Sequence, residues 1–480
     1  MRKKIIGLFV CLLLMATAVP AVEALKDNVV NPTISTPTTL TLITNKIEKQ
    51  KLLHSDVAGI IYFEYCASLD GDTGVVGTYR GDTPYGWGGS VYIFNRINNI
   101  WRHQQRIFAP VPEDRDCFGW SVAVSGDTVL IGVPYTYTGD ISGHVYVFTR
   151  TGTRWTQQAK LLASDGEEWD RFGISVALDG DTALIGSYGD RDHGNWSGSA
   201  YVFTRTGTTW TQQAKLLASD GTTCDFFGAS VALEGDTALV GAPGDGYLRV
   251  GPGSAYVFTR SGTTWTQQAK LFDPNGAQAD QFGISVSIDG DTALIGGQQI
   301  ENYSNGNGLA YVFTRTGTTW TQQAKLLSAD GEKWDRFGYS VAVSGDTVLI
   351  GAMQDWPGSV YVFTRDGTNW VQQQKLQASG KFGNWFGISV ALDGDTALIA
   401  AYFVADTYRY GSSYIFTRTG TTWVEQTRLF NYKVTSYEHD QVSRYLTIRA
   451  SMIESYYQII EKLFQRFPNA FPVIRYLKGL

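Results

Sequence analysis

The sequence predicts an all-β protein, a seven-bladed β-propeller of four-stranded antiparallel blades with a C-terminal amphipathic helical tail. The first observation is a block of about 55 residues that recurs seven times between Ser55 and Phe430. The second is the pattern within each copy, where period-two apolar runs and turn residues mark four short strands. Repeated units of four antiparallel strands assemble most naturally into a propeller. A β-helix or leucine-rich solenoid would use shorter turns of chain, and a sandwich would not need near-identical copies.

The N-terminus is typical of an export signal. Arg2, Lys3 and Lys4 precede an apolar run over residues 5–15, and Val22-Glu23-Ala24 offers a plausible cleavage site. We therefore expect a signal peptide over residues 1–24 and a mature protein outside the cytoplasm, extracellular or at the cell surface. Residues 25–48 are rich in Thr, Pro and Asn, which favours an extended linker before the propeller at 49–430.

One copy illustrates how each blade should fold. The first two strands are predicted at Ser175 to Leu178 and Thr182 to Gly186, joined by the turn Asp179-Gly180. The third and fourth are predicted at Ala200 to Arg205 and Trp210 to Leu217, joined by the turn Thr206-Gly207-Thr208. Lys49 to Leu53 resembles the end of a fourth strand, so the chain carries eight versions of that strand for seven blades. We expect one end of the chain to supply the strand that closes the ring, and the sequence leaves open which end.

The C-terminal segment, residues 431–480, has a different pattern. Apolar residues from Tyr445 to Phe467 follow helical spacing, which predicts an amphipathic helix that ends near Pro468. From Arg444 onward the segment holds six basic and two acidic side chains. Two interpretations stay open: a helix packed on the propeller, or an element for sorting, membrane-surface contact or partner docking.

The repeated FG, GDT and YVFTR elements resemble the FG-GAP repeats of the propeller in integrin α subunits and in many microbial surface proteins. The resemblance covers residues 55–430 and implies a cell-surface location and binding to proteins or glycans, without a particular ligand. Integrin-like repeats hold a calcium loop of the type DxDxDGxxxD, whereas here that connection is reduced to Asp179-Gly180-Asp181-Thr182 and its equivalents. Two carboxylates cannot supply the six to eight oxygens that calcium prefers, so we expect no metal and interpret the repeated aspartates as turn residues. They are Asp72, Asp127, Asp181, Asp236, Asp291, Asp346 and Asp395.

Composition and motifs limit the possible chemistry. The 39 basic and 45 acidic side chains argue against a nucleic-acid binder. No motif indicates a cofactor or a catalytic centre, and the loop Asp190-Arg191-Asp192-His193 is interpreted as a solvated polar loop. The acidic residue two before each repeated phenylalanine is interpreted as a loop hydrogen-bonding group; these residues are Asp116, Asp170, Asp225, Asp280 and Asp335, with Asn384 in the last copy.

Cysteine usage does not indicate a disulfide framework. Cys66, Cys117 and Cys224 remain in the mature chain, and none recurs between copies. One disulfide plus a free thiol stays open. Asn195 and Asn302 begin sequons and are candidates for surface glycosylation.

The aromatic residues fall into two groups. Repeated ones should be structural: phenylalanines such as Phe172 would fill the gaps between blades, and tryptophans such as Trp210 would cover the outer strands. The others lie in loops that join the second and third strands or join blades, and both loop types emerge on one face of an up-and-down propeller. We take ten of these as candidate ligand-binding residues: Trp87, Trp120, Trp169, Trp196, Trp334, Trp356, Trp385, Tyr135, Tyr247 and Tyr303. The alternative is that these rings merely cover the blade ends.

The sequence therefore predicts an exported, non-catalytic binding or adhesion module that presents an aromatic-rich loop face to a surface glycan or an extracellular protein. An enzyme acting on extracellular polysaccharide is one alternative, since paired carboxylates could come from distant loops. A structural component of the cell envelope is another.

Overall fold

A computed structural model of the protein describes residues 61–62, 66–81, 88–110, 117–136, 142–245, 251–277, 280–298, 306–379, 383–404 and 412–429. The predicted signal peptide, the linker over 25–48, the segment Lys49 to Leu53 and the helical tail over 431–480 lie outside these residues. The described part of the chain contains no helix with the length and apolar character that a membrane crossing needs.

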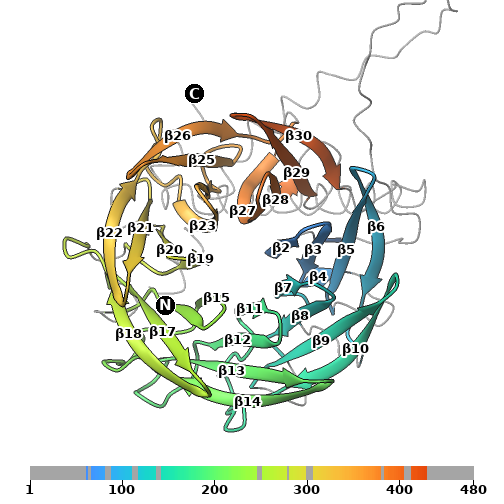
Figure 1. The fold of residues 1–480 in the computed structure, drawn as a ribbon, viewed down its shortest axis with the longest axis vertical. Helices are drawn as coiled ribbons and strands as arrows, with labels where there is room; N and C mark the ends of the chain where they lie inside the picture. Colours follow the sequence, from blue (N-terminus) through green and yellow to red (C-terminus); the bar gives the residue numbers. More distant parts are fainter. Residues whose placement is uncertain are drawn as a thin grey trace, which may run out of the picture. The chain divides into compact units, whose positions relative to one another are not determined.

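Seven four-stranded antiparallel sheets form the blades of a propeller, which confirms the predicted fold class (Figure 1). Blade 1 consists of β2 (Cys66–Asp70), β3 (Thr73–Thr78), β5 (Ser90–Ile97) and β6 (Ile100–Ile107). Blade 2 consists of β7 (Ser121–Ser125), β8 (Thr128–Val133), β9 (His144–Thr151) and β10 (Arg154–Leu161). Blade 3 consists of β11 (Val176–Asp179), β12 (Thr182–Ser187), β13 (Ser199–Thr206) and β14 (Thr209–Leu216).

The remaining blades repeat this order. Blade 4 consists of β15 (Ser230–Glu234), β16 (Thr237–Ala242), β17 (Ser254–Ser261) and β18 (Thr264–Leu271). Blade 5 consists of β19 (Ser285–Asp289), β20 (Thr292–Gly297), β21 (Leu309–Thr316) and β22 (Thr319–Leu326). Blade 6 consists of β23 (Phe337–Ser344), β24 (Thr347–Ala352), β25 (Ser359–Asp366) and β26 (Asn369–Leu376). Blade 7 consists of β27 (Gly383–Asp393), β28 (Thr396–Val404), β29 (Ser412–Thr419) and β30 (Thr422–Leu429). A separate two-stranded sheet pairs β1 (Ile61–Tyr62) with β4 (Arg80–Gly81).

Glycine turns fix the register of each blade. In blade 3 the pairing of Asp179 with Thr182 leaves a two-residue turn whose first residue, Gly180, has φ 54°. A positive φ at the first turn position favours glycine, because a side chain there strains the backbone. The second hairpin repeats the arrangement at Gly207, with φ 63°. The predicted strands of this copy therefore agree with the observed ones to within one or two residues.

The outer strand of every blade contains a β-bulge, and in blade 3 the extra residue of the bulge bonds to the next blade. In β14 the register shifts past Gln213, because Val202 pairs with Ala214 and Phe203 pairs with Gln212. A bulge redirects the side chain of the extra residue. Gln213 accepts a hydrogen bond of 2.9 Å from Trp265 Nε1 in blade 4. Equivalent bonds join four more pairs: Trp155 with Gln104, Trp210 with Gln158, Trp320 with Gln268, and Trp370 with Gln323.

The repeated phenylalanines fill the spaces between blades, as predicted. Phe227 is fully buried and packs with Leu184 and Val202 of blade 3 and with Val240 and Tyr256 of blade 4. Five other copies are equally enclosed, with exposures of 0–1%: Phe118, Phe172, Phe282, Phe337 and Phe386.

Blades 7 and 1 meet by side-to-side packing. Leu398 and Ile415 of blade 7 share a buried cluster with Val76 and Trp101 of blade 1. Each of the seven sheets takes its four strands from one continuous stretch of chain. The expectation that one end of the chain supplies a closing strand is therefore wrong for these sheets. The physical reason is that blade 1 already has its own outer strand, β6, and blade 7 has β30.

Replacing Phe227 by alanine should lower the free energy of unfolding by about 3–5 kcal/mol, because it empties a space enclosed by two blades. Chemical denaturation of the purified protein measures this change. Phe272→Ala is the control, since Phe272 is 49% exposed and should change stability by no more than about 0.5 kcal/mol. Equal effects of the two substitutions would show that Phe227 does not hold the blades together.

Candidate functional site

The propeller has two faces with different loops. The tips of both hairpins in each blade lie on one face, here called the hairpin face. The loops between the second and third strands and the loops between blades lie on the other, here called the loop face, because the four strands of a blade alternate in direction.

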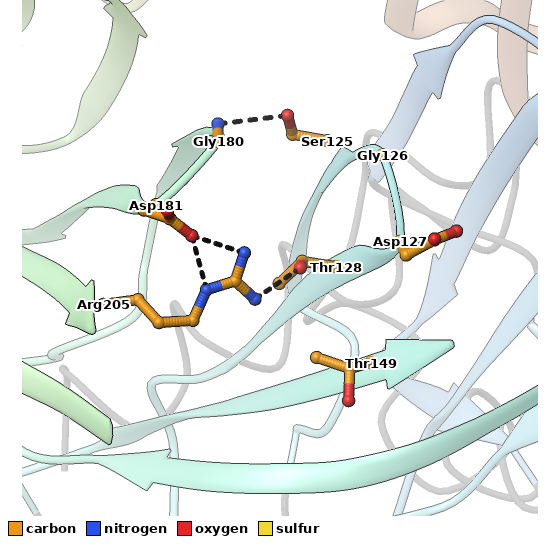
Figure 2. Close-up of a pocket in the computed structure, with 8 residues that line it drawn as sticks. All are labelled: Ser125, Gly126, Asp127, Thr128, Thr149, Gly180, Asp181 and Arg205. Carbon is orange, nitrogen blue, oxygen red and sulfur yellow. Dashed lines mark hydrogen bonds and ion pairs between the residues drawn. The ribbon is translucent and has the colours of Figure 1, made fainter. Parts of the chain in front are cut away.

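On the hairpin face, a repeated arginine joins neighbouring blades. Figure 2 shows one such place, a recess between blades 2 and 3, where Arg205 binds Asp181 of its own blade at 2.6 Å and donates a hydrogen bond of 2.8 Å to Thr128 Oγ1 of blade 2. Gly180 N–H also donates to Ser125 Oγ across the same boundary, at 3.2 Å (Figure 2).

All seven repeated aspartates form this ion pair, with N–O distances of 2.5–2.7 Å, and their partners are Arg96, Arg150, Arg205, Arg260, Arg315, Arg365 and Arg418. Each arginine also lies over the repeated tryptophan of its blade, as Arg205 does over Trp210 at 5.2 Å. The interpretation of these aspartates as structural turn residues is thereby confirmed. Because the recess is built around a glycine, an aspartate, a threonine and an arginine that recur in every copy, it is a poor candidate for a ligand site.

The loop face of blade 3 holds a lysine surrounded by carboxylates. Lys215 Nζ lies 2.7 Å from Asp165, 2.8 Å from Asp190 and 2.7 Å from Asp192, and the Tyr201 hydroxyl donates to Asp165 and Asp190. Burial raises the pKa of Asp190, but the hydrogen bonds from Lys215 and Tyr201 outweigh it, so the pKa lies below its usual range.

The interpretation of the loop at 190–193 as solvated is therefore wrong for Asp190, which is only 3% exposed. The sequence did not reveal this, because Lys215 lies in the regular pattern of an outer strand. Blades 4 and 6 repeat the cluster. Lys270 binds Asp220 and Asp245, each at 2.6 Å, and Lys375 binds Asp330 at 2.8 Å and Asp355 at 2.7 Å.

The acidic residues before the repeated phenylalanines hold the inter-blade loops together, as predicted. Asp170 accepts a hydrogen bond of 2.6 Å from Glu167 N–H, and Asp225, Asp280 and Asp335 accept the equivalent bonds in their own loops. Burial raises the pKa of Asp170 to about 6. Asp116 lies outside the described residues, as does the side chain of Asn384.

No three His, Cys, Asp or Glu side chains among the described residues are grouped in a way that could hold a metal ion. Cys66, Cys117 and Cys224 are free thiols, which answers the question that the sequence left open. Cys66 Sγ donates to Gly119 O of the next blade at 3.3 Å, a place where other copies use serine, such as Ser175 with Gly228 O. Burial raises the pKa of the Cys66 thiol to about 12, so this residue is a structural group.

Several of the candidate aromatic residues pack against one another. The ring centroids of Trp120 and Tyr135 lie 4.8 Å apart, and those of the stacked Tyr188 and Trp196 lie 5.6 Å apart. The hydroxyls of Tyr135 and Tyr188 share a hydrogen bond of 3.1 Å. Trp385 stacks in the same way on Tyr402, at 4.8 Å. These rings are half-buried, so the alternative that they cover the blade ends holds in part for them.

Three tryptophans are different, because they are well exposed on the loop face. The exposed fractions are 49% for Trp169, 53% for Trp334 and 71% for Trp356. Trp87, Tyr247, Tyr303 and Asn302 lie outside the described residues, and Asn195 is exposed.

Sequence reasoning missed two contributors to this surface. The guanidinium carbon of Arg171 lies 4.2 Å from the centroid of the Tyr135 ring and 4.8 Å from that of the Trp169 ring. Phe226 packs edge-on against Trp196 at 6.0 Å. Both precede the repeated phenylalanine, a position that varies between copies, and this variation is the signal that could have identified them.

Comparisons with known proteins agree with the repeat pattern. The FG-GAP repeat profile matches residues 47–94, 101–148, 155–203, 210–258, 265–313, 320–363 and 370–416. Human integrin alpha-X is 28% identical over 158 residues, which are 30% of this chain and 13% of the integrin, and human integrin alpha-D is 27% identical over 158 residues with the same coverage. The chain thus spans only a small part of these relatives.

Two solved structures are similar to this chain. A putative 6-phosphogluconolactonase from Bacteroides fragilis has a TM-score of 0.50 at 13% identity, with 75% of this chain and 96% of that chain covered. The β-propeller domain of the Trilobed protease from Pyrococcus furiosus has a TM-score of 0.48 at 12% identity, with coverages of 77% and 98%. At these identities the likeness concerns the fold alone.

The raised pKa of Asp170 predicts a pH-dependent stability. The native state keeps this proton up to about pH 6, whereas an unfolded aspartate loses it near pH 4. The free energy of unfolding should therefore fall as the pH rises from 4 to 6, and Asp170→Asn should lack this contribution. Denaturation at pH 4 and pH 7 should show the wild type losing up to about 3 kcal/mol relative to the variant. A difference that stays constant over this interval would contradict the role assigned to burial.

Proposed function

The chain belongs to the FG-GAP repeat family, and from this premise we propose that it is an exported, non-catalytic binding or adhesion module. Its ligand, a surface glycan or an extracellular protein, would bind to the loop face. The observation that carries the proposal is the exposure of Trp169, Trp334 and Trp356 on that face, at 49%, 53% and 71%. Large exposed rings are costly to leave in water and are common at binding sites.

The geometry of the loops favours binding without much reordering. Trp169 and Trp334 both have φ 76°, a left-handed conformation that bulky residues rarely adopt. The loops hold them there through hydrogen bonds such as Asp170 with Glu167 N–H. A ring fixed in advance loses little conformational entropy when a ligand covers it. Covering about 100 Å² of one tryptophan would contribute about 2–3 kcal/mol.

An enzyme acting on polysaccharide is the second candidate, and one observation favours it. Asp170 and Asp190 lie in the same cluster with pKa values moved in opposite directions, as in a general acid and its partner. In blades 4 and 6 the pKa values of Asp225 and Asp335 are also raised by burial, but the neighbouring carboxylates with a lowered pKa, Asp220 and Asp330, are the equivalents of Asp165. A recurring arrangement fits a structural role better than a unique catalytic site. Release of reducing sugar that disappears in Asp190→Asn would favour the enzyme.

Export and surface retention are part of the proposal. The predicted signal peptide supports secretion, and the basic tail after residue 430 supports docking to a partner or a membrane surface. Cell-surface retention that persists after deletion of residues 431–480 would refute the role of the tail. Self-association without a soluble ligand would instead indicate a structural envelope component.

Substitution of the three exposed tryptophans, Trp169, Trp334 and Trp356, by alanine should weaken binding at least about tenfold, because such rings dominate binding energy. Binding of the full chain to a glycan array and to intact cells measures the effect. Ile97→Ala is the control, since it removes an apolar side chain of similar exposure, 54%, beside the β5–β6 hairpin turn on the opposite face. Unchanged binding by a folded triple variant would refute the loop face as the ligand surface.

A further inference from the structure

Blades 3 and 6 carry the same pair of loop tryptophans. One member lies three residues before the repeated phenylalanine, Trp169 in blade 3 and Trp334 in blade 6. The other lies two residues before the glycine that precedes the third strand, Trp196 in blade 3 and Trp356 in blade 6. Among the seven copies in the sequence, these two alone have tryptophan at both positions. In blade 4, for example, the equivalents are Cys224 and Gly251.

The two members of each pair come from loops that are bonded to each other. In blade 3, Gly189 N–H donates to Asp170 O at 2.9 Å and so joins the β12–β13 loop to the residue after Trp169. In blade 6, Gln354 N–H donates to Asp335 O at 3.1 Å and joins the β24–β25 loop to the residue after Trp334. Each pair therefore belongs to one connected pair of loops at the end of its blade.

The first tryptophan of each pair has the same backbone conformation in blades 3 and 6. Trp169 and Trp334 have the same φ, 76°, and Trp196 has φ 63°. A left-handed conformation is unfavourable for a bulky residue. It recurs at Cys224 of blade 4, with φ 70°, so it belongs to the loop of the repeat, and in blades 3 and 6 this loop carries a tryptophan.

The charges around the pairs select among ligands. In blade 3 the two loops and Lys215 contribute six acidic side chains, from Asp165 to Asp192, against three basic ones. In blade 6 the count is four acidic against three basic. Asp165 and Asp330 keep 47% and 54% of their side chains exposed even while they bind lysine. Exposed carboxylates accept hydrogen bonds from hydroxyl groups and repel anions.

Aromatic faces beside carboxylate acceptors fit the two surfaces of a sugar ring, apolar C–H groups and hydroxyls. Blades 3 and 6 lie on opposite sides of the ring (Figure 1). From these observations we propose that the two tryptophan pairs are equivalent subsites for an uncharged polysaccharide, so that one protein binds the polymer at two places. This inference rests on the proposed function and names the class of its ligand.

Binding at both subsites would be much tighter than binding at one. The free energy that a single subsite gains from covering its rings is largely offset by the entropy lost on association. A repeating polymer that reaches both subsites turns the second contact into an intramolecular step, and such avidity exceeds single-site affinity by about 10²–10⁴. The rigid blades keep the distance between the subsites constant.

The test uses the full chain with dextran, mannan and xylan as uncharged polymers, alginate and heparin as anionic ones, and tetrasaccharides of each uncharged polymer. With the tetrasaccharide of a polymer that binds, calorimetry at high ligand concentration should give two weak sites per protein, one site in Trp169→Ala or Trp334→Ala, and none when both are changed. Binding of the polymer without any binding of its tetrasaccharide would overturn the assignment of two subsites. Each single substitution should weaken binding to the parent polymer about 10–100-fold, because avidity is lost.

Phe272→Ala is the control and should keep both sites, and circular dichroism should show that every variant is folded. One site in the wild type, or preferred binding of alginate or heparin, would overturn the inference. Binding to cells without any glycan signal would also overturn it and leave the proposed function standing, with a protein as the ligand. Binding to neither cells nor glycans would refute both.

Discussion

The rest of the structure depends on the packing between neighbouring blades. A four-stranded sheet has two apolar faces, and each must be covered by the next blade around the ring. One buried phenylalanine, such as Phe227 with no exposed surface, fills the space at each of six boundaries. A glutamine turned outward by a bulge and an arginine on the hairpin face bond across a boundary, as Gln213 and Arg260 do between blades 3 and 4. The same arginine bond joins the ends of the ring, since Arg96 of blade 1 donates to Thr396 of blade 7 at 3.1 Å.

This division of labour separates stability from recognition. Residues that recur in every copy hold the boundaries, and each hydrogen bond or exposed ion pair among them contributes about 1 kcal/mol or less. Repetition around the ring makes that contribution substantial. The loops on the opposite face also bond across the boundaries, but through backbone groups such as Phe227 N–H and Ser197 O at 3.0 Å, so their side chains can differ from blade to blade. The acidic clusters around Lys215, Lys270 and Lys375 contribute to both roles. They recur in three blades, and they hold the loops on which the variable residues lie.

The sequence predicted the strands well because short-range signals determine them. The turn at Gly180 and the alternation around Tyr201 are visible within a few residues, and repetition reinforces them. It predicted the aromatic surface less well. Whether Trp196 is exposed depends on Tyr188 and on Phe226 of the next blade, and no local pattern reports such contacts. Asp190 was misjudged for the same reason, since its partner Lys215 lies 25 residues away along the chain.

Near-identical repeats also explain why the tryptophan pairs are informative. Where copies share so much sequence, a feature in one copy alone can be an accident of divergence. Blades 3 and 6, on opposite sides of the ring, share tryptophan at the same two loop positions, whereas blade 4 has the left-handed residue, Cys224 with φ 70°, and the lysine cluster without these rings. Rigid blades cannot bring the two pairs together on one small ligand, so their resemblance has a physical use only when the ligand itself repeats. A polymer with uncharged, hydroxyl-rich units offers the same group at many places along its length and suits the exposed carboxylates of this face.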